Sequence, residues 1–310
     1  MVLEAGDSVW VAAREPFDFR YVLAYFGRSD DEILDVVQQG AHRRVLLEPG
    51  ETALIETVES LCDGVAGVRA RVLSGRISED ELRGHLKRQY QLNGDRSFHR
   101  ISDPLARELI DSFPGAPTVQ AGSPYETLVW AIIGQQINIA FAHRLKRAFV
   151  EHFGERLYHN DRTYYAFPRV DVVAGLDHER DLLPLQFSRQ KSRYIIGISR
   201  AILAGELDFD VIHQTEDEEA LDTLRAHLGV GRWTAEYTLL RGLGRRDVIP
   251  AGDAGLKAAL GVHYGLGRNA TEHEVRTAAE AWRPNRGAIG FLIWLSLQYG
   301  WFHKAGTAKC

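Results

Sequence analysis

The sequence predicts an α+β fold in which an antiparallel-sheet domain, residues 1–115, precedes an all-α domain, residues 116–310. In the first third, short β-rich runs are broken by glycine, and one run alternates apolar with charged residues. From residue 125 onward apolar residues recur at helical spacing instead. Between them, residues 112–124 carry three prolines and two glycines, the composition of a linker or a functional loop. We therefore place the boundary near residue 116.

The N-terminal part should form a sheet with one solvent-facing side. Its strand candidates are residues 43–47, 53–58 and 68–72. Two segments have helical spacing, residues 30–39 and 79–91. The second begins after Ser78, three residues before Glu81, a pattern typical of a capping box.

The rest of the chain should be helical. Pro124 suits the first turn of one long helix that ends before Gly154. The further helix candidates are residues 189–204, 217–228, 232–243, 253–262, 272–282 and 287–302.

Composition excludes several classes of protein. With 45% apolar and 25% charged residues in 310, the chain can bury a core, which excludes disorder. Two cysteines exclude a disulfide framework, a four-thiolate zinc site and a four-cysteine iron–sulfur cluster. The first residues lack the apolar core of a secretory signal, and the longest apolar stretch, 288–302, is shorter than a membrane span. We expect a cytoplasmic protein without a membrane partner.

The net charge of −5 is unevenly distributed. Residues 1–115 carry 14 Lys and Arg against 20 Asp and Glu, whereas the remainder carries 23 against 22. A local basic face in the second part would allow phosphate binding on an acidic protein. A solvated surface of mixed charge explains the same counts.

A glycine-containing turn separates two amphipathic segments in Leu224-Arg-Ala-His-Leu-Gly-Val-Gly-Arg-Trp-Thr-Ala235. Gly229 and Gly231 leave backbone N–H groups uncovered at the start of the second helix. Such a turn can hold a phosphate through N–H donors and the positive helix end. Taken alone, a tight helical hairpin without a ligand fits equally well.

Twenty residues after Trp233, the loop Asp247-Val-Ile-Pro-Ala-Gly-Asp253 delivers a carboxylate to the start of another helix. Asp253 could be an N-cap, which is worth about 1 kcal/mol. The order of hairpin, helix, loop and aspartate nevertheless resembles the helix-hairpin-helix DNA glycosylases. Residues 129–138 resemble the helix that opens their domain, and residues 282–294 resemble the closing helix of the bacterial 3-methyladenine DNA glycosylase II family.

The resemblance implies base-excision repair by a monomeric enzyme on double-stranded DNA that carries alkylated bases, with the enzyme at the bacterial nucleoid. Asp253 would face the flipped-out nucleotide and act in catalysis. The hairpin residues that would hold a DNA phosphate are Gly229, Gly231, Arg232 and Thr234. No cofactor is required, although the family suggests a structural Na⁺ or K⁺ held by the backbone carbonyls of Arg225, His227 and Val230.

Trp233 indicates the subtype, because bifunctional members have a lysine there that forms a Schiff base with the sugar. An indole cannot, so we expect a monofunctional enzyme that leaves an abasic site. The resemblance assigns Tyr25, Trp233, Tyr237 and Trp294 to the base pocket. For each ring alone, core packing is the commoner role. Together they suit cationic alkylpurines such as 3-methyladenine, since ring faces attract cations.

Two departures from the family concern specificity. Leu295 replaces a second aromatic residue, which suggests a wider pocket. The shortened loop before Ser123 leaves either Val119 or Gln120 as the wedge that fills the gap of the flipped base. Two other functions remain open: a non-catalytic helix-hairpin-helix DNA-binding protein, and a glycosylase of the same fold for oxidised or mispaired bases.

Overall fold

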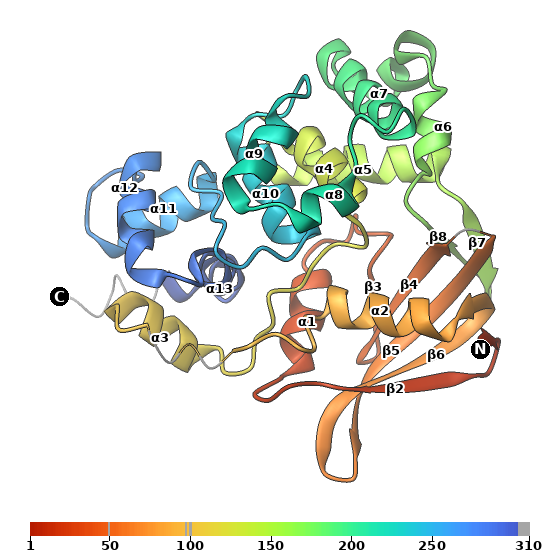
Figure 1. Cartoon of the computed structure of the whole chain (residues 1–310), viewed down its shortest axis with the longest axis horizontal. Coiled ribbons are helices and arrows are strands. Elements are labelled where there is room, and N and C mark those ends of the chain that lie inside the picture. Colours follow the sequence, from red (N-terminus) through yellow and green to blue (C-terminus); the bar gives the residue numbers. More distant parts are fainter. Residues whose placement is uncertain (49, 97, 99–100, 303–310) are drawn as a thin grey trace.

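Antiparallel strands fill the N-terminal third of the chain and helices most of the remainder in the computed structural model (Figure 1), which describes residues 1–48, 50–96, 98 and 101–302. This confirms the predicted α+β fold. The strands are β1 (Val2–Glu4), β2 (Ser8–Ala12), β3 (Val36–Gln38), β4 (Ala41–Glu48), β5 (Glu51–Cys62), β6 (Val65–Ser78), β7 (Arg156–His159) and β8 (Arg162–Tyr165).

The helices carry most of the second part. They are α1 (Phe19–Phe26), α2 (Glu79–Gln89), α3 (Pro104–Ser112), α4 (Pro124–Gly134), α5 (Ile139–Phe153), α6 (Val170–Ala174), α7 (Arg189–Leu203), α8 (Phe209–Gln214), α9 (Asp217–Arg225), α10 (Arg232–Gly242), α11 (Ala254–His263), α12 (Glu272–Ala279) and α13 (Arg286–Gln298). Short turns of other helical types lie at His178–Leu182, Leu183–Leu185 and Glu280–Trp282. In the part of the chain so described, no helix is long and apolar enough to cross a membrane.

The main sheet has the order β1-β6-β5-β4-β3, and β2 also pairs with β6. In residues 68–72 the valine and alanine side chains are buried and the two arginines are exposed, as the alternation predicted. Helices α1 and α2 cover one face and contribute to its apolar core (Figure 1). The other face packs on residues of β8. The predicted strands 43–47 and 53–58 lie inside β4 and β5.

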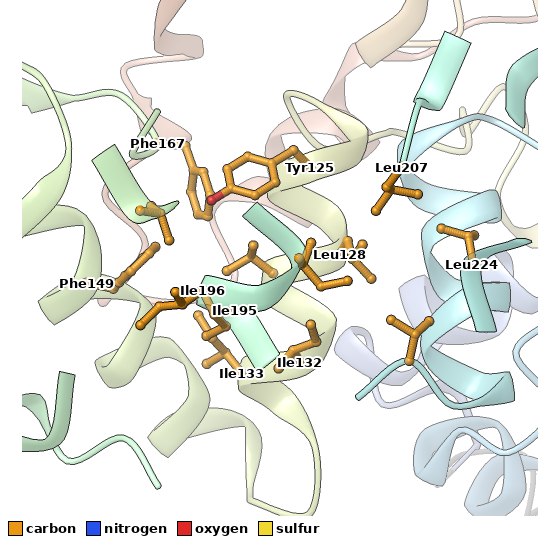
Figure 2. Packing of buried hydrophobic residues seen from close by; sticks show 14 of the residues in the cluster. Tyr125, Leu128, Ile132, Ile133, Phe149, Phe167, Ile195, Ile196, Leu207 and Leu224 are labelled. Carbon is orange, nitrogen blue, oxygen red and sulfur yellow. The ribbon is translucent and has the colours of Figure 1, made fainter. Parts of the chain in front are cut away.

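Helix α4 is the centre of the helical part (Figure 2). Its side chains are buried along most of its length, which agrees with its nearly unbroken apolar sequence. Leu128 and Ile132 lie in one cluster with Phe149 of α5, Ile195 of α7 and Leu224 of α9 (Figure 2). Helix α4 therefore supports the hairpin formed by α9 and α10.

A second helical cluster joins α3 to α11, α12 and α13. Leu105 and Leu109 of α3 are buried with Leu260 and Ile289. The Trp282 indole donates a hydrogen bond to Asp103 Oδ1 at 3.0 Å. Helix α3 thus packs with the C-terminal helices although it precedes residue 116, and our domain boundary there stays a prediction.

The predicted helix over residues 30–39 is wrong, because this segment is irregular and ends in β3. Asp35 is buried and accepts hydrogen bonds from Arg44 Nη1 at 2.6 Å and from His42 Nε2 at 3.0 Å. Burial opposes the charged carboxylate, yet Arg44 and His42 lower the pKa of Asp35. These bonds to β4, outside the segment, override the local helical spacing.

Ion pairs join the sheet to the helical part. Arg44 of β4 also binds Glu126 of α4, and Lys146 of α5 binds Glu32, with all four side chains almost fully buried. Removing one partner of such a pair typically costs about 3–5 kcal/mol, because the other charge stays buried and unpaired. The pairs therefore fix β4 and the segment that follows α1 relative to the helical part.

Two further local predictions are corrected. The single helix over residues 124–153 is two helices, because Gln136 has a left-handed φ of 56° and Asn138 caps α5 by accepting from the Phe141 amide at 2.9 Å. The capping box at α2 does not form. Glu51 of β5 accepts from the Ser78 amide at 2.6 Å and so occupies the donor that Glu81 would need. The later helices agree with prediction within a few residues, apart from the turn at Glu280–Trp282.

Candidate active site and DNA-binding hairpin

Asp253 is the N-cap of α11 and is partly exposed. Its Oδ1 accepts from the Leu256 amide at 3.0 Å and from Trp294 Nε1 of α13 at 2.9 Å. The capping role considered from the sequence is therefore real. Both of these bonds end on Oδ1, so they fix the orientation of the carboxylate without using Oδ2. A carboxylate held in this way can act on a developing positive charge next to it.

Three aromatic rings lie side by side near this carboxylate. Trp233 and Tyr237, one turn apart on α10, have ring centres 5.5 Å apart, and Tyr237 and Trp294 have centres 5.8 Å apart. Each of the three is partly exposed. Trp130 of α4 donates through Nε1 to the Tyr237 hydroxyl at 3.1 Å. The rings thus form an aromatic site held from behind by α4.

Tyr25 of α1 extends this aromatic site toward the sheet domain. Its ring lies 4.9 Å from that of Phe291, which in turn lies 6.4 Å from Trp294. Burial alone would raise the pKa of the Tyr25 hydroxyl, but the charges of Arg241 and Arg28 lower it below its usual value. The structure therefore brings together all four aromatic residues that the sequence assigned to the pocket.

The hairpin turn presents uncovered amides at the start of α10. Gly231 is its N-cap, without a side-chain cap, and a Cβ added there would meet no atom within 4 Å. Gly229 has φ 91°, and a Cβ there would come within 2.3 Å of the Tyr194 ring. The two glycines thus differ in role: Gly229 allows a close approach to α7, and Gly231 leaves space for a ligand.

The other two hairpin residues direct their side chains to the protein. The Thr234 hydroxyl is buried and accepts from Gln135 Nε2 at 3.0 Å, while the same nitrogen donates to the Gly229 carbonyl at 2.9 Å. Arg232 donates to the buried Glu236 at 2.9 Å. Arg276 of α12 also pairs with Glu236, at 2.8 Å. The turn therefore offers a phosphate its backbone amides and the outer guanidinium nitrogens of Arg232, whose side chain is 48% exposed, but not the buried Thr234 hydroxyl.

A groove of about 830 Å³ runs along the turn, between the ends of α4, α7 and α10. Its wall includes Gln136, Lys191, Gly231 and Trp233. Lys191 Nζ donates to the Ile133 carbonyl at 2.6 Å, and burial lowers the pKa of this lysine. The groove leads from the open amides to the first ring of the aromatic site.

The wedge predictions are contradicted by burial. Val119 is 0% exposed, in the core beneath α1 and α2, and Gln120 is 4% exposed, so neither reaches a duplex. The loop before Ser123, which was expected to supply the wedge, passes through the interior between the two parts of the chain. Backbone hydrogen bonds fix it there, from the Gln120 amide to Gln89 and from the Ala121 amide to Arg241.

The carbonyls proposed for a monovalent cation lie around the turn. Arg225 ends α9, where the last carbonyls lack intrahelical donors. The His227 carbonyl accepts from the Val230 amide at 3.1 Å and keeps one lone pair. Neutral oxygens at a helix end suit Na⁺ or K⁺, so the residues present fit such an ion.

Comparison with known proteins establishes the family. Residues 129–284, which include the second half of α4, the hairpin and the Asp253 loop, match the family described as "HhH-GPD superfamily base excision DNA repair protein". The chain belongs to this family. The match confirms the helix-hairpin-helix glycosylase resemblance inferred from the hairpin and the loop.

Whole-chain relatives agree with this membership of the HhH-GPD family. The DNA-3-methyladenine glycosylase of Bacillus subtilis is 28% identical over 297 residues, which cover 94% of this chain and 97% of the relative. The 3-methyladenine DNA-glycosylase from Archaeoglobus fulgidus has a TM-score of 0.76 at 25% identity, covering 95% of this chain and 97% of that one. An 8-oxoguanine glycosylase/lyase from Clostridium acetobutylicum shares the fold, with a TM-score of 0.73 at 21% identity over 95% of this chain and 98% of that one.

Sequence reasoning missed several residues of this HhH-GPD site. Trp130 lies inside the segment used for the resemblance, yet nothing in the sequence linked its indole to Tyr237. Arg241 was visible only as one of many arginines, although it lies one turn after Tyr237 on α10. The left-handed Gln136 was hidden by the expectation of a continuous helix. Only a predicted helix end at Gly134 would have placed Gln136 in a connection between two helices.

Proposed function

We propose that the protein is a monofunctional DNA glycosylase that excises alkylated bases, 3-methyladenine above all, and leaves an abasic site. The observation that carries this proposal is the Asp253 carboxylate, fixed by the Trp294 indole beside Trp233 and Tyr237. The relatives that cover nearly the whole chain and are named 3-methyladenine glycosylases support the same substrate class.

The hairpin would hold the DNA backbone. The open N-cap at Gly231 offers amides at the positive end of α10, a site for a phosphate on either side of the lesion. A Na⁺ or K⁺ on the carbonyls of Arg225, His227 and Val230 would add positive charge to the same turn. Phosphate contacts carry little sequence information, which suits an enzyme that searches all DNA for damage.

The flipped base would stack among the rings while the sugar faces Asp253. Alkylation weakens both the base pair and the glycosidic bond, so a damaged base flips and departs more readily than a normal one. As the bond breaks, the sugar gains oxocarbenium character, and the fixed carboxylate stabilises this charge or orients the attacking water. The electron pair of the broken C–N bond stays with the base, so a cationic alkylated base leaves as a neutral molecule. The oxygen of water bonds to the sugar carbon, and its proton passes to Asp253 or to solvent.

Trp233 supports the monofunctional assignment, because an indole cannot form a Schiff base with the sugar. Lys146, the lysine that lines the cavity beneath Tyr25, is bound to Glu32 and almost fully buried. A lysine held in that ion pair would have to lose both its charge and its partner before attacking a sugar.

We assign the wedge to Gln136 in place of the two buried candidates. It is exposed, and it lies on the junction of α4 and α5 at the groove beside the hairpin. Non-glycine residues with positive φ are uncommon and often functional. A Gln136→Ala variant should keep affinity for undamaged DNA and lose base release. Equal rates of release would remove Gln136 from this role.

A lesion panel tests the proposed function. Duplexes with alkylated, oxidised and mispaired bases are incubated with the protein, and abasic sites are revealed by alkaline cleavage. Release of alkylated bases, with strand breaks only after alkali, is the expected result. DNA binding without release would show a non-catalytic protein. Release of oxidised or mispaired bases alone would assign the other substrate class.

A further inference from the structure

Arg241, in the last turn of α10, is a buried cation with no hydrogen-bonded acid among the residues that the structure describes. Arg241 is 3% exposed. Its Nε and Nη1 atoms are buried without an acceptor among the described residues. The guanidinium carbon lies 4.5 Å from the ring centre of Tyr25 and 4.9 Å from that of Phe291. Ring faces compensate only partly for the loss of water, so an unpaired buried guanidinium is costly to retain.

The acids around Arg241 are already bound to other cations. Glu32 is bound to Lys146, and Asp35 and Glu126 share Arg44. Arg28 adds a second positive charge, with its guanidinium carbon 3.9 Å from the ring centre of Tyr25. The surroundings of Tyr25 therefore carry an excess of positive charge and unused N–H donors.

These donors lie at the inner end of the aromatic site. Arg241 follows Tyr237 by one turn on the same face of α10, and both line a cavity of about 30 Å³ together with Tyr25 and Trp130. Such a volume admits a group the size of one water molecule, not a base. An exocyclic atom on the edge of a base is a group of that size.

We propose that Arg241 binds an acceptor oxygen on the flipped base and thereby raises the release of guanine-type purines relative to that of adenine-type purines. An arginine side chain donates hydrogen bonds and cannot accept them. Guanine presents the O6 acceptor, whereas adenine presents an amino donor at the same position. The amino group would leave both buried donors unpaired and would face a second set of donors.

Tyr25 supports this assignment. Tyr25 lines the same cavity, and the two arginines lower the pKa of its hydroxyl, which makes the O–H a stronger donor toward the same oxygen. The inference rests on the proposed glycosylase function and adds a selection within alkylated purines. It also opposes a simple expectation, because rings alone would bind cationic 7-methylguanine and 3-methyladenine alike.

The release of a guanine-type base and of an adenine-type base can be measured in a single reaction. Duplex DNA treated with a methylating agent contains 7-methylguanine, which has the O6 acceptor, and 3-methyladenine, which has the amino group. The wild-type protein and an Arg241→Met variant are incubated with this DNA, and each released base is quantified by mass spectrometry after subtraction of spontaneous loss. We expect the ratio of 7-methylguanine to 3-methyladenine release to fall roughly tenfold in the variant.

The ratio is insensitive to the fraction of folded enzyme, because both bases meet the same sample. Arg241→Lys keeps the charge but loses the planar pair of donors, and it should lower the ratio as well. Arg246→Met is the matched control, since this arginine lies 5.5 Å from the Phe98 ring and outside the pocket. Its ratio should equal that of wild type.

An unchanged ratio in an active Arg241→Met or Arg241→Lys variant would overturn the assignment. A similar fall in Arg246→Met would also overturn it, because the effect would then not belong to the pocket. If the wild-type protein releases neither base, the proposed glycosylase function fails, and this result differs from an unchanged ratio.

Discussion

Replacing Asp253 by asparagine separates its cap from its charge. The side-chain oxygen of asparagine can accept from the Leu256 amide and from Trp294 Nε1, as Oδ1 does at 3.0 and 2.9 Å. Asparagine and aspartate are about equally good N-caps, so α11 should begin at the same residue. The variant therefore keeps the fold and the position of Trp294, and loses only the negative charge.

The cost of that lost charge can be estimated. A unit charge about 4 Å from the developing oxocarbenium, at an effective dielectric constant of about 20, contributes roughly 4 kcal/mol. In other enzymes, removal of one preorganised electrostatic partner costs about 3–4 kcal/mol, in agreement with this Coulomb estimate. We therefore expect base release to slow by at least about 100-fold, with the upper range near 1,000-fold.

Single-turnover release of 3-methyladenine from methylated DNA measures this effect, because product dissociation does not enter. DNA affinity and thermal unfolding are measured on the same preparation and should match wild type. Asp253→Ala is the comparison, since it also loses the cap. Its free energy of unfolding should be about 1 kcal/mol lower than that of wild type. A release rate for Asp253→Asn within about threefold of wild type would leave Asp253 as a cap only and refute the mechanism.

Three other perturbations test separate parts of the structure. A Cβ at position 231 would meet no atom within 4 Å, so Gly231→Val should fold normally. It should weaken binding to damaged and undamaged DNA alike by at least about tenfold in a binding titration, whereas equal affinity would remove the hairpin from the interface. Trp233→Ala should raise the activation free energy of base release by about 1–3 kcal/mol, and more for cationic than for neutral bases. Borohydride should trap no adduct of the wild-type protein with DNA, and a trapped adduct would contradict the monofunctional assignment. Burial lowers the pKa of His85 to about 3 and that of His143 to about 4. Below about pH 6.5 the unfolded chain therefore binds more protons than the folded chain does. The free energy of unfolding should fall as the pH drops toward 4. Urea unfolding should show a shallower fall for His85→Leu, and an identical pH dependence would argue against a buried neutral His85.

Local pattern was sufficient for much of the secondary structure. The alternation of residues 68–72 predicted a strand with one wet face, and Val68 is buried in β6 as expected. The glycines of residues 229–231 predicted a short turn between two helices, and the structure has it between α9 and α10. These features depend on residues near one another in the chain, so a short segment of the sequence is enough to predict them.

Predictions failed where a residue outside the segment supplied the partner. Residues 30–39 have helical spacing, but the buried bonds from Arg44 and His42 to Asp35 hold an irregular segment that ends in β3. Glu51 takes the Ser78 amide that a capping box would use. Neither partner can be identified from local spacing, because each comes from another strand of the sheet.

The candidate site shows the same division. The order of hairpin, loop and Asp253, and the identity of Trp233, were determined by the sequence alone and led to the family. Only the tertiary structure decided that Trp294 orients Asp253 and that Val119 and Gln120 are interior residues. It also decided that Arg241 lies beside Tyr25 with two nitrogens that have no acceptor in the described part of the chain. A motif records which groups are available, whereas burial and partnering, which determine what each group can bind, arise when distant segments pack together.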